Sequence, residues 1–235
     1  KYFPLLLKLF WMINLHDVSL VIATYNEEES IEFVLNELSS YNFFEILIVD
    51  NNSDDKTLEI ADRFDTKILQ QKGNGWGNAV LEGLDAASGE YITYMDADGS
   101  YNPKTIVEMY QLIDDYDFIC GSRYKHGNKS EDDTFIRAIG NKIFTFITNH
   151  FLNLKISDSL FFYPLFKKSD YENINPKSRN FGLCIEVPYL LSKNNLRYTD
   201  ILSLERKRYA GKSKVNAIKD GLIIFIEIIR MGTKN

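Results

Sequence analysis

The sequence predicts a single α/β domain in which a mostly parallel, Rossmann-like β-sheet is flanked by helices. Short apolar runs of strand length alternate with segments whose apolar residues recur at helical spacing, and such alternation implies parallel strands joined by right-handed crossovers. Polar clusters follow several of the expected strands. The chain has 235 residues, 45% of them hydrophobic, which is enough for one large core.

The first half of the chain shows the alternation most clearly. Val18–Ala23 is a compact apolar run, and Glu27–Leu38 carries apolar residues at helical spacing. Tyr91–Met95 is a short run of aromatic and β-branched residues, which pack well inside a sheet. The other expected strands cover 45–50, 66–69 and 117–121, and the other expected helices cover 56–64, 78–87 and 103–113.

The second half reads as a C-terminal elaboration of the same domain. We expect helices over 135–154, 181–191 and 215–230 and a strand over 196–204. The aromatic run 158–166 contains Pro164, which lacks a backbone donor and therefore predicts an edge strand or a loop. No linker rich in proline, glycine or serine divides the chain, so we treat 1–17, 18–127 and 128–235 as regions of one continuous domain.

Two apolar segments are candidates for contact with a membrane surface. Tyr2–Leu15 is interrupted by Lys8 and is shorter than the roughly 20 residues that span a bilayer, so we expect an interfacial or packed helix. The last helix combines Leu222–Ile226 with Glu227 and Arg230, and it is also too short and too charged to span. We therefore expect a cytoplasmic protein that is peripheral on the inner face of the cell membrane.

Charge and cysteine content narrow the function classes. The formal net charge is -6, and no long basic stripe is present, which argues against nucleic-acid binding. Cys120 and Cys184 lie in apolar settings without CxxC spacing, which is typical of packed thiols in a reducing compartment. Neither cysteine is expected to be a nucleophile or a metal ligand.

An acidic pair directly follows the expected strand 91–95. Asp96 and Asp98 are two residues apart, so their carboxylates point to the same side if the backbone stays extended. Carboxylates are ligands for Mg²⁺ or Mn²⁺, and an ion there would hold a substrate diphosphate; an ordinary solvated turn is the alternative. Asp50 and Arg123 follow two other strands and are expected at the same edge, where ligands of parallel sheets bind.

Three other segments have a structural explanation beside a functional one. Thr24 and Glu27 fit a capping box that satisfies amides at a helix start. The glycine-rich loop Lys72–Gly77 lacks the spacing of a dinucleotide-binding loop, although amides before a helix suit a phosphate. The basic patch Arg206–Lys214 is either a ligand site or a solvated loop.

Several of these segments together resemble one known family. The matching stretches are Val18–Glu27, Val49–Ser53, Gly89–Asp98, Gly121–Tyr124 and Arg208–Lys214. In this order they resemble family 2 glycosyltransferases of the GT-A nucleotide-diphospho-sugar transferase fold, especially dolichol-phosphate mannose synthase and bacterial polyprenyl-phosphate glycosyltransferases. The resemblance covers about residues 18–230, and the ordered set is more specific than any one motif.

The resemblance implies a metal-dependent, inverting transfer from a nucleotide-diphosphate sugar of the GDP-mannose or UDP-glucose type to a polyprenyl or dolichyl phosphate. The residues expected to bind the nucleotide sugar are Ala23, Thr24, Tyr25, Glu27, Asp50, Asn51, Lys72, Asp96 and Ala97. Those expected to hold Mg²⁺ or Mn²⁺ are Asp96, Asp98 and Ser100. The expected acceptor-phosphate residues are Arg123, Arg137, Asn141, Arg208, Ser213 and Lys214, and the expected catalytic residues are Asp98, Arg123 and Arg208.

The chain also departs from the family pattern. Asn51 stands where the family often has aspartate, Ser100 where mannose synthases often have glutamine, and Asn141 where a serine is usual. Phe161–Pro164 replaces an expected Ser-Gly-Phe-Arg pattern. These changes bear on the specificity for sugar and acceptor more than on the fold.

Two other functions stay open from the sequence. A phosphate acceptor is largely ionised at neutral pH and needs no dedicated general base. A family 2 transferase that adds sugar to a glycan hydroxyl would need a carboxylate base, for which Glu186 is the available candidate. A protein that binds nucleotide sugars without transferring them is the second alternative.

Overall fold

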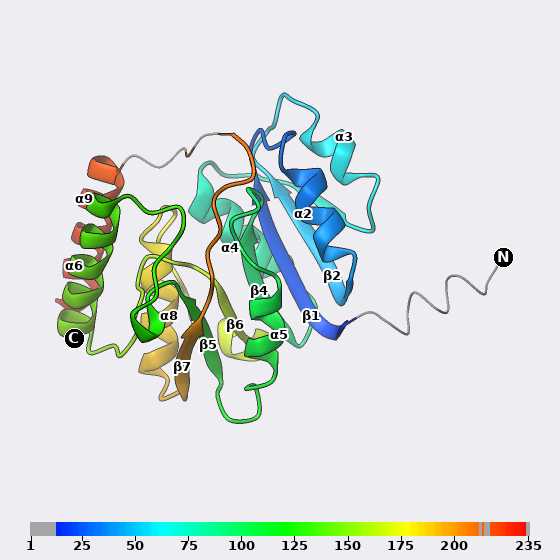
Figure 1. Cartoon of the computed structure of the whole chain (residues 1–235). Coiled ribbons are helices and arrows are strands. Elements are labelled where there is room, and N and C mark those ends of the chain that lie inside the picture. Colours follow the sequence, from blue (N-terminus) through cyan, green and yellow to red (C-terminus); the bar gives the residue numbers. More distant parts are fainter. Residues whose placement is uncertain (1–12, 212, 214–216, 234–235) are drawn as a thin grey trace.

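Seven strands form one sheet in the computed structural model, which describes residues 13–211, 213 and 217–233 (Figure 1). Their order across the sheet is β3-β2-β1-β4-β6-β5-β7. The strands are β1 (Ile13–Thr24), β2 (Tyr41–Asp50), β3 (Lys67–Gln70), β4 (Tyr91–Asp96), β5 (Phe118–Ser122), β6 (Pro164–Lys167) and β7 (Tyr198–Leu202). Only β6 runs antiparallel to its neighbours, so the other six strands end at the same edge. The predicted mostly parallel sheet is therefore confirmed.

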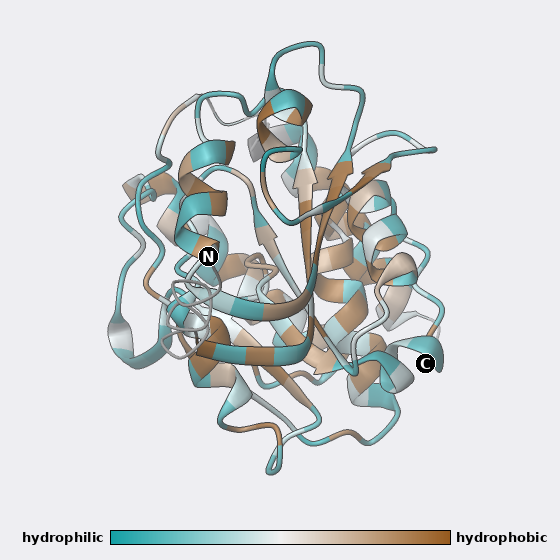
Figure 2. Ribbon diagram, turned by 90° about the vertical axis from the view of Figure 1, so that its right-hand side faces the viewer, coloured by the Kyte–Doolittle hydropathy of each residue, from teal (hydrophilic) through white to brown (hydrophobic). Residues whose placement is uncertain are grey.

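Helices cover both faces of this sheet. They are α2 (Ile31–Leu38), α3 (Thr57–Ala61), α4 (Trp76–Ala86), α5 (Lys104–Tyr110), α6 (Phe135–Leu152), α7 (Lys168–Glu172), α8 (Leu183–Lys193) and α9 (Ala217–Gly232), with a 3-10 turn η1 (Lys125–Gly127). Alternate residues of β1 enter opposite layers: Leu20 and Ile22 pack with α2 and α5, whereas Val21 packs with α4 and α8. Figure 2 shows these central strands as hydrophobic ribbons between the two helical layers.

A third apolar cluster packs α6 and α9 against α8. Leu152 of α6, Ile185 and Tyr189 of α8, and Ile224 and Ile228 of α9 are buried together. Figure 1 shows α6 and α9 side by side next to α8. Helices α6 and α9 are thus packed against α8 in a cluster separate from the two on the faces of the sheet.

The N-terminal boundary differs from the expected one. Strand β1 begins at Ile13, and Ile13–Leu15 pair with Tyr41–Phe43 of β2. These three residues are therefore strand and not the end of a helix, because they join the parallel ladder of the sheet. The rest of the expected segment Tyr2–Leu15 lies outside the described residues. Within the described part of the chain, no helix is long and apolar enough to cross a membrane.

Pro164 lies in the interior of the sheet, so the prediction of an edge strand or loop is wrong. Strand β6 lies between β4 and β5. Pro164 is its first residue and is in register with Cys120 of β5, while the pairing with β4 begins at Leu165. A proline at a strand's first position removes no donor from the ladder, which explains why it is accepted there.

Candidate active site

A buried aspartate joins the carboxyl ends of β1 and β2. Asp50, the last residue of β2, accepts a hydrogen bond from Thr24 Oγ1 at 3.1 Å. It also accepts from the backbone N–H of Ser53 at 2.9 Å and from its hydroxyl at 2.5 Å. Asp50 is fully buried, so it fixes the loops at this edge and does not line the cavity beside them.

The predicted capping box at the start of α2 is wrong. The helix begins at Ile31, and its N-cap residue is Ser30. Thr24 donates to Asp50 instead, and Ser30 Oγ donates to the Glu27 carboxylate at 3.0 Å. Because Thr24 and Glu27 have these other partners, they do not cap the helix, and residues 25–30 form the loop between β1 and α2.

A cavity of about 280 Å³ lies over this edge and is called the β1–β4 cavity below. Its walls come from the loops after β1 and β4 and from the start of α4. The lining residues are Ala23, Thr24, Tyr25, Glu27, Asn51, Gly75, Trp76, Ala79, Asp96, Ala97, Asp98, Phe181 and Arg208. Most residues predicted to bind a nucleotide sugar are therefore gathered here, and Asp50 and Lys72 are the two that are not.

The glycine-rich loop does not bring Lys72 to the site. Glu82, within α4, accepts the backbone N–H groups of Lys72 and Gly73, each at 2.8 Å. Lys72 itself is exposed and does not line the β1–β4 cavity. Two amides of the loop expected to suit a phosphate therefore bond to a carboxylate of the helix that follows it.

Asp96 ends β4 at the floor of the β1–β4 cavity. Tyr94 Oη donates to Asp96 Oδ1, and Trp76 Nε1 donates to the same oxygen at 3.3 Å. Burial raises the pKa of Asp96 to about 6, and the negative charge of Asp98 adds to this effect. Among the described residues, Asp96 accepts hydrogen bonds only at Oδ1, which leaves Oδ2 for a ligand.

Asp98 is held from two sides. Its Oδ1 accepts the backbone N–H of Ser100 at 2.8 Å and the Ser100 hydroxyl at 2.7 Å. Its Oδ2 lies 2.8 Å from Nη2 of Arg208. Ser100, predicted as a metal ligand, therefore orients the Asp98 carboxylate in this structure.

The chemistry of the acidic pair suits a divalent cation that is shared with a substrate. Mg²⁺ and Mn²⁺ prefer oxygen ligands, and Mg²⁺ sites commonly combine one or two carboxylates with substrate phosphates and water. In the described part of the chain, no group of three or more His, Cys, Asp or Glu side chains is placed to hold a metal. Asp96 and Asp98 would therefore hold such an ion only together with phosphate oxygens or water.

A second cavity of about 430 Å³ adjoins the first and is called the α6–α9 cavity below. Of the residues predicted to bind the acceptor phosphate, those that line it are Arg123, Arg137, Asn141, Arg208 and Ser213. Lys214 lies outside the described residues. The residues common to both cavities are Trp76, Asp96, Asp98, Phe181 and Arg208, so the acidic pair stands where the two spaces meet.

Arg123 is fixed by a buried carboxylate that the sequence did not point out. Asp158 accepts Nε of Arg123 at 2.7 Å, Nη2 at 3.0 Å and the backbone N–H at 3.2 Å. Nη1 of Arg123 lies 3.6 Å from Oε2 of Glu205. Burial raises the pKa of Glu205 to about 7, although the charge of Arg123 opposes the shift. A buried arginine requires a carboxylate partner. From the sequence, this requirement predicts only that an acidic residue lies near Arg123, and not which one.

Arg137 and Asn141 extend along one face of α6 toward the same cavity. Arg137 Nη1 lies 3.5 Å from Asp132, and its Nη2 lies 3.5 Å from the Ser213 hydroxyl. Asn141 Nδ2 donates to Tyr124 Oη at 2.6 Å. These polar groups are thus held in place before any ligand enters.

The segment that carries Arg208 is anchored on the turn after β4. Arg206 donates its backbone N–H to the Ser100 carbonyl at 2.9 Å, and Tyr209 donates to the Asp98 carbonyl at 2.8 Å. The Tyr209 ring stacks on Phe33 with centroids 4.2 Å apart. Residues more than 100 positions apart in the chain therefore meet through backbone hydrogen bonds, which hydrophobic periodicity does not reveal.

Glu186, the candidate carboxylate base for a hydroxyl acceptor, makes structural hydrogen bonds. It accepts the backbone N–H groups of Lys177 at 2.8 Å and Ser178 at 2.5 Å, and it lines neither cavity. Its carboxylate caps the loop before α8.

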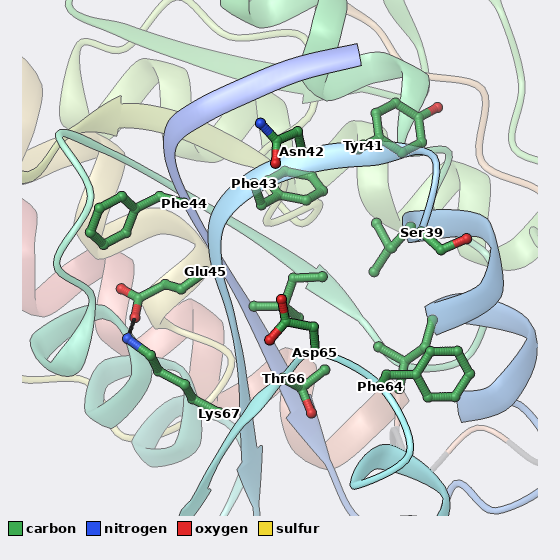
Figure 3. A pocket seen from close by; sticks show the side chains of 13 residues that line it. Ser39, Tyr41, Asn42, Phe43, Phe44, Glu45, Phe64, Asp65, Thr66 and Lys67 are labelled. Atoms are coloured by element: carbon green, nitrogen blue, oxygen red, sulfur yellow. Dashed lines mark hydrogen bonds and ion pairs between the residues drawn. The ribbon is translucent and has the colours of Figure 1, made fainter. Parts of the chain in front are cut away.

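The cavity in Figure 3, of about 500 Å³, lies at the opposite end of the strands. It surrounds the amino-terminal part of β2, where Tyr41, Phe43 and Phe44 supply an aromatic lining. Its charged pair, Lys67 Nζ and Glu45 Oε2, is closed at 2.7 Å. Glu45 also accepts from Ser19 and Ser88, which makes it a structural group.

Comparisons with known proteins agree with this arrangement. The family model "Glycosyl transferase family 2" matches residues 19–174, more than half of the chain. Glycosyltransferase AglJ of Haloferax volcanii is 27% identical over 93% of this chain and 73% of its own length. The UDP-N-acetylglucosamine–dolichyl-phosphate N-acetylglucosaminyltransferase of Methanococcus voltae is 26% identical over 78% of this chain and 83% of its own length.

Two further relatives complete the comparison. The dolichol-phosphate mannosyltransferase of Pyrococcus furiosus is 36% identical over 53% of this chain, and the match spans only 38% of that protein. Glucosyl-3-phosphoglycerate synthase from Mycobacterium tuberculosis, solved with Mn²⁺ and UDP, superposes with a TM-score of 0.70 at 15% identity over 92% of this chain and 80% of its own. The chain therefore belongs to glycosyl transferase family 2 and is a glycosyltransferase of GT-A fold.

Proposed function

We propose that this enzyme transfers a sugar from a nucleotide-diphosphate sugar to the phosphate of a polyprenyl or dolichyl phosphate, with Mg²⁺ or Mn²⁺ as cofactor. The observation that carries the proposal is that two cavities meet at Asp96 and Asp98, with carboxylates at the junction and arginines on the far side. Acids suit the metal side of a donor diphosphate, and arginines suit a phosphate acceptor. The relatives named for dolichyl-phosphate transfer support the same acceptor class.

The donor would occupy the β1–β4 cavity. Thr24, Tyr25 and Asn51 line this cavity, and the base and ribose would lie against them. Asp96 and Asp98 would face the diphosphate. When bound, the divalent cation neutralises the diphosphate and stabilises the departing nucleoside diphosphate.

The acceptor phosphate would occupy the α6–α9 cavity. Arg123 is held rigid by Asp158, and Arg137 and Arg208 reach the same space. An oxygen of the phosphate monoester attacks the anomeric carbon from the side opposite the leaving group, and the bond from that carbon to the diphosphate breaks with inversion. The arginines bind and orient the attacking phosphate, which is already largely ionised at neutral pH.

The acids of the α6–α9 cavity bear on the choice between a phosphate and a hydroxyl acceptor. Asp132 is paired with Arg137, Asp133 accepts from the Tyr124 hydroxyl, and Glu205 accepts from the Ser130 hydroxyl. Deprotonating a sugar hydroxyl requires a carboxylate base within hydrogen-bond reach of the acceptor. A phosphate monoester needs no such group. A hydroxyl acceptor would need Glu205 or Asp220, the other carboxylates that line this cavity, as its base.

Membrane association of this face is part of the proposal. α6 and α9 lie side by side (Figure 1). Both helices carry large apolar side chains that are exposed to solvent. These are Phe135, Ile136, Ile139, Ile143, Phe146 and Phe151 on α6, and Leu222, Phe225, Ile226 and Ile229 on α9. Exposed apolar patches of this kind mark interaction sites. Because both helices also line the acceptor cavity, we place the enzyme on the inner face of the cell membrane, with this patch in the headgroup region.

The direct test is a transfer assay with labelled GDP-mannose, UDP-glucose and UDP-N-acetylglucosamine in the presence of Mn²⁺. With one of these donors, we expect label to enter an organic-extractable product when polyprenyl phosphate is supplied. The matched control is the corresponding polyprenol, which lacks only the phosphate and should receive no label. Equal labelling of the alcohol, or transfer only to a glycan or to phosphoglyceric acid, would contradict the proposal.

A further inference from the structure

We infer that Arg208 acts as a built-in cation at Asp98: it competes with the divalent metal for that carboxylate, and metal binding releases it toward the acceptor phosphate. This inference rests on the proposed function for the direction in which Arg208 moves, but its central step is a property of the protein and the metal alone. It makes Arg208 the residue that couples the donor and acceptor halves of the site.

The contact itself is direct and largely shielded from water. Nη2 of Arg208 lies 2.8 Å from Oδ2 of Asp98, and the two side chains are 21% and 8% exposed. Nη1 lies 3.8 Å from Oε1 of Glu27, in the wall of the β1–β4 cavity. The guanidinium therefore lies between the two cavities. It contacts Asp98 Oδ2, the carboxylate oxygen that Ser100 does not contact.

A metal ion and this guanidinium compete for Asp98 Oδ2. Oδ1 of Asp98 already accepts two hydrogen bonds from Ser100, so Oδ2 is the oxygen best placed for a cation. Two cations at one oxygen would repel each other strongly in a partly desolvated site. Binding of a divalent ion therefore requires the guanidinium to move away.

The backbone permits the side chain to move while its attachment stays fixed. Arg206 and Tyr209, on either side of Arg208, donate their backbone N–H groups to Ser100 and Asp98. The Tyr209 ring is further held by stacking on Phe33. Rotation of the Arg208 side chain about its own bonds moves the charge from the junction into the α6–α9 cavity, whose lining it already forms.

The other arginines of the cavity are held differently. Arg123 is fixed by Asp158, which is fully buried at its side chain and contacts no proposed ligand. Arg137 is paired with Asp132, away from the acidic junction. Within the described residues, Arg208 alone among these three contacts a carboxylate of the proposed metal pair.

The test is titration of Mn²⁺ alone, without nucleotide or lipid, into the wild type and three variants by calorimetry. Arg208→Gln should bind Mn²⁺ about three- to tenfold more tightly, because loss of an ion pair of this exposure corresponds to about 1 kcal/mol and 1.4 kcal/mol is a factor of ten. Arg208→Lys keeps the charge and should stay close to the wild type. Arg137→Gln removes the same charge from the same cavity and should change the affinity less than twofold.

Two results would overturn the inference. One is an Mn²⁺ affinity that Arg208→Gln leaves unchanged or weakens while its melting temperature stays near that of the wild type. The other is an equal gain in Arg137→Gln, which would mean that only the overall field matters. No sugar is transferred in this experiment, so the inference and the proposed function can fail separately. If the wild type transfers sugar to polyprenyl phosphate but Arg208→Gln binds Mn²⁺ no more tightly, only the inference is wrong. If Arg208→Gln binds Mn²⁺ more tightly but the wild type does not transfer sugar to polyprenyl phosphate, only the proposed function is wrong.

Discussion

Tyr209 donates its backbone N–H to the carbonyl oxygen of Asp98 at 2.8 Å, and this bond fastens the C-terminal half of the chain to the acidic turn. Gly99, which follows Asp98 in the turn after β4, lies close to the same segment. Its φ is +80°, and a Cβ built there would lie 2.9 Å from Cβ of Tyr209. The close approach of these two segments places Arg208 on Asp98 and so joins the two cavities.

Replacing Gly99 should disturb this junction. In Gly99→Ala the new methyl group meets Tyr209 and the backbone is strained, so we expect a loss of about 1–3 kcal/mol in the free energy of unfolding. Gly127→Ala is the matched control, because its φ is +78° and no atom lies within 4 Å of the added Cβ. Denaturant unfolding checks the difference, and equal losses in the two variants would show that the contact with Tyr209 is unimportant.

The pair between Arg123 and Asp158 should contribute strongly to stability. Asp158→Asn removes the closer of the two carboxylates that face the buried guanidinium and leaves Glu205 at 3.6 Å, so we expect a cost of about 3 kcal/mol. Asp117→Asn removes the partner of Arg197, which is exposed, and should cost about 0–1 kcal/mol. Urea unfolding of both variants measures the contrast. A loss below 1 kcal/mol in Asp158→Asn would mean that Arg123 finds another partner.

Glu205 should make stability fall as the pH rises. Burial raises its pKa to about 7 in the folded protein, so the folded state holds a proton that the unfolded state has already released. The resulting stability is fully present below the unfolded pKa near 4.5 and is lost as the pH rises through about 7. Glu205→Gln should lack this contribution, so the difference between variant and wild type should change by about 1–3 kcal/mol between pH 5 and pH 8. A difference that stays constant over this range would contradict the prediction.

Asp98 should be required for metal-dependent donor binding. Asp98→Asn removes the charge while keeping the size of the side chain, and we expect the Mn²⁺-dependent part of nucleotide-sugar affinity to fall by a factor of ten or more. Asp65→Asn, in the cavity at the opposite end of the strands, is the control. Calorimetry with and without Mn²⁺ measures both, and a full metal effect in Asp98→Asn would exclude Asp98 as a ligand.

The apolar face of α6 and α9 should bind lipid. Phe146 is 71% exposed and Ile226 is 56% exposed, so replacing both with aspartate should leave folding nearly unchanged while weakening flotation with anionic vesicles about tenfold or more. Phe44→Asp, at the opposite end of the sheet, alters a residue that is 51% exposed and should float like the wild type. Equal flotation of all three proteins would place the membrane contact elsewhere.

The parallel half of the fold could be predicted from the sequence because its strands are continuous apolar runs that end in polar residues. Asp50, Asp96, Asp98 and Arg123 do follow strand ends at one edge. Pro164 misled the prediction because the pattern does not show that it occupies the first position of its strand.

The pairings within the site could not be predicted in the same way. The contact of Arg123 with Asp158 joins residues 35 positions apart, and it depends on how two loops pack. Lys72 and Glu186 are residue types suited to a site, yet Lys72 is exposed outside the β1–β4 cavity and Glu186 accepts backbone amides beside α8. Residue type and spacing indicate which groups are available, whereas tertiary hydrogen bonds decide which of them face the cavity.

In the proposed reaction, the new bond forms between the anomeric carbon of the sugar and an oxygen of the lipid phosphate. The most direct measurement is the ³¹P spectrum of polyprenyl phosphate before and after incubation with the enzyme, Mn²⁺ and the active nucleotide sugar. We expect the monoester resonance to be replaced by a diester resonance in proportion to the nucleoside diphosphate released. A sugar-containing product whose lipid phosphate remains a monoester would contradict it.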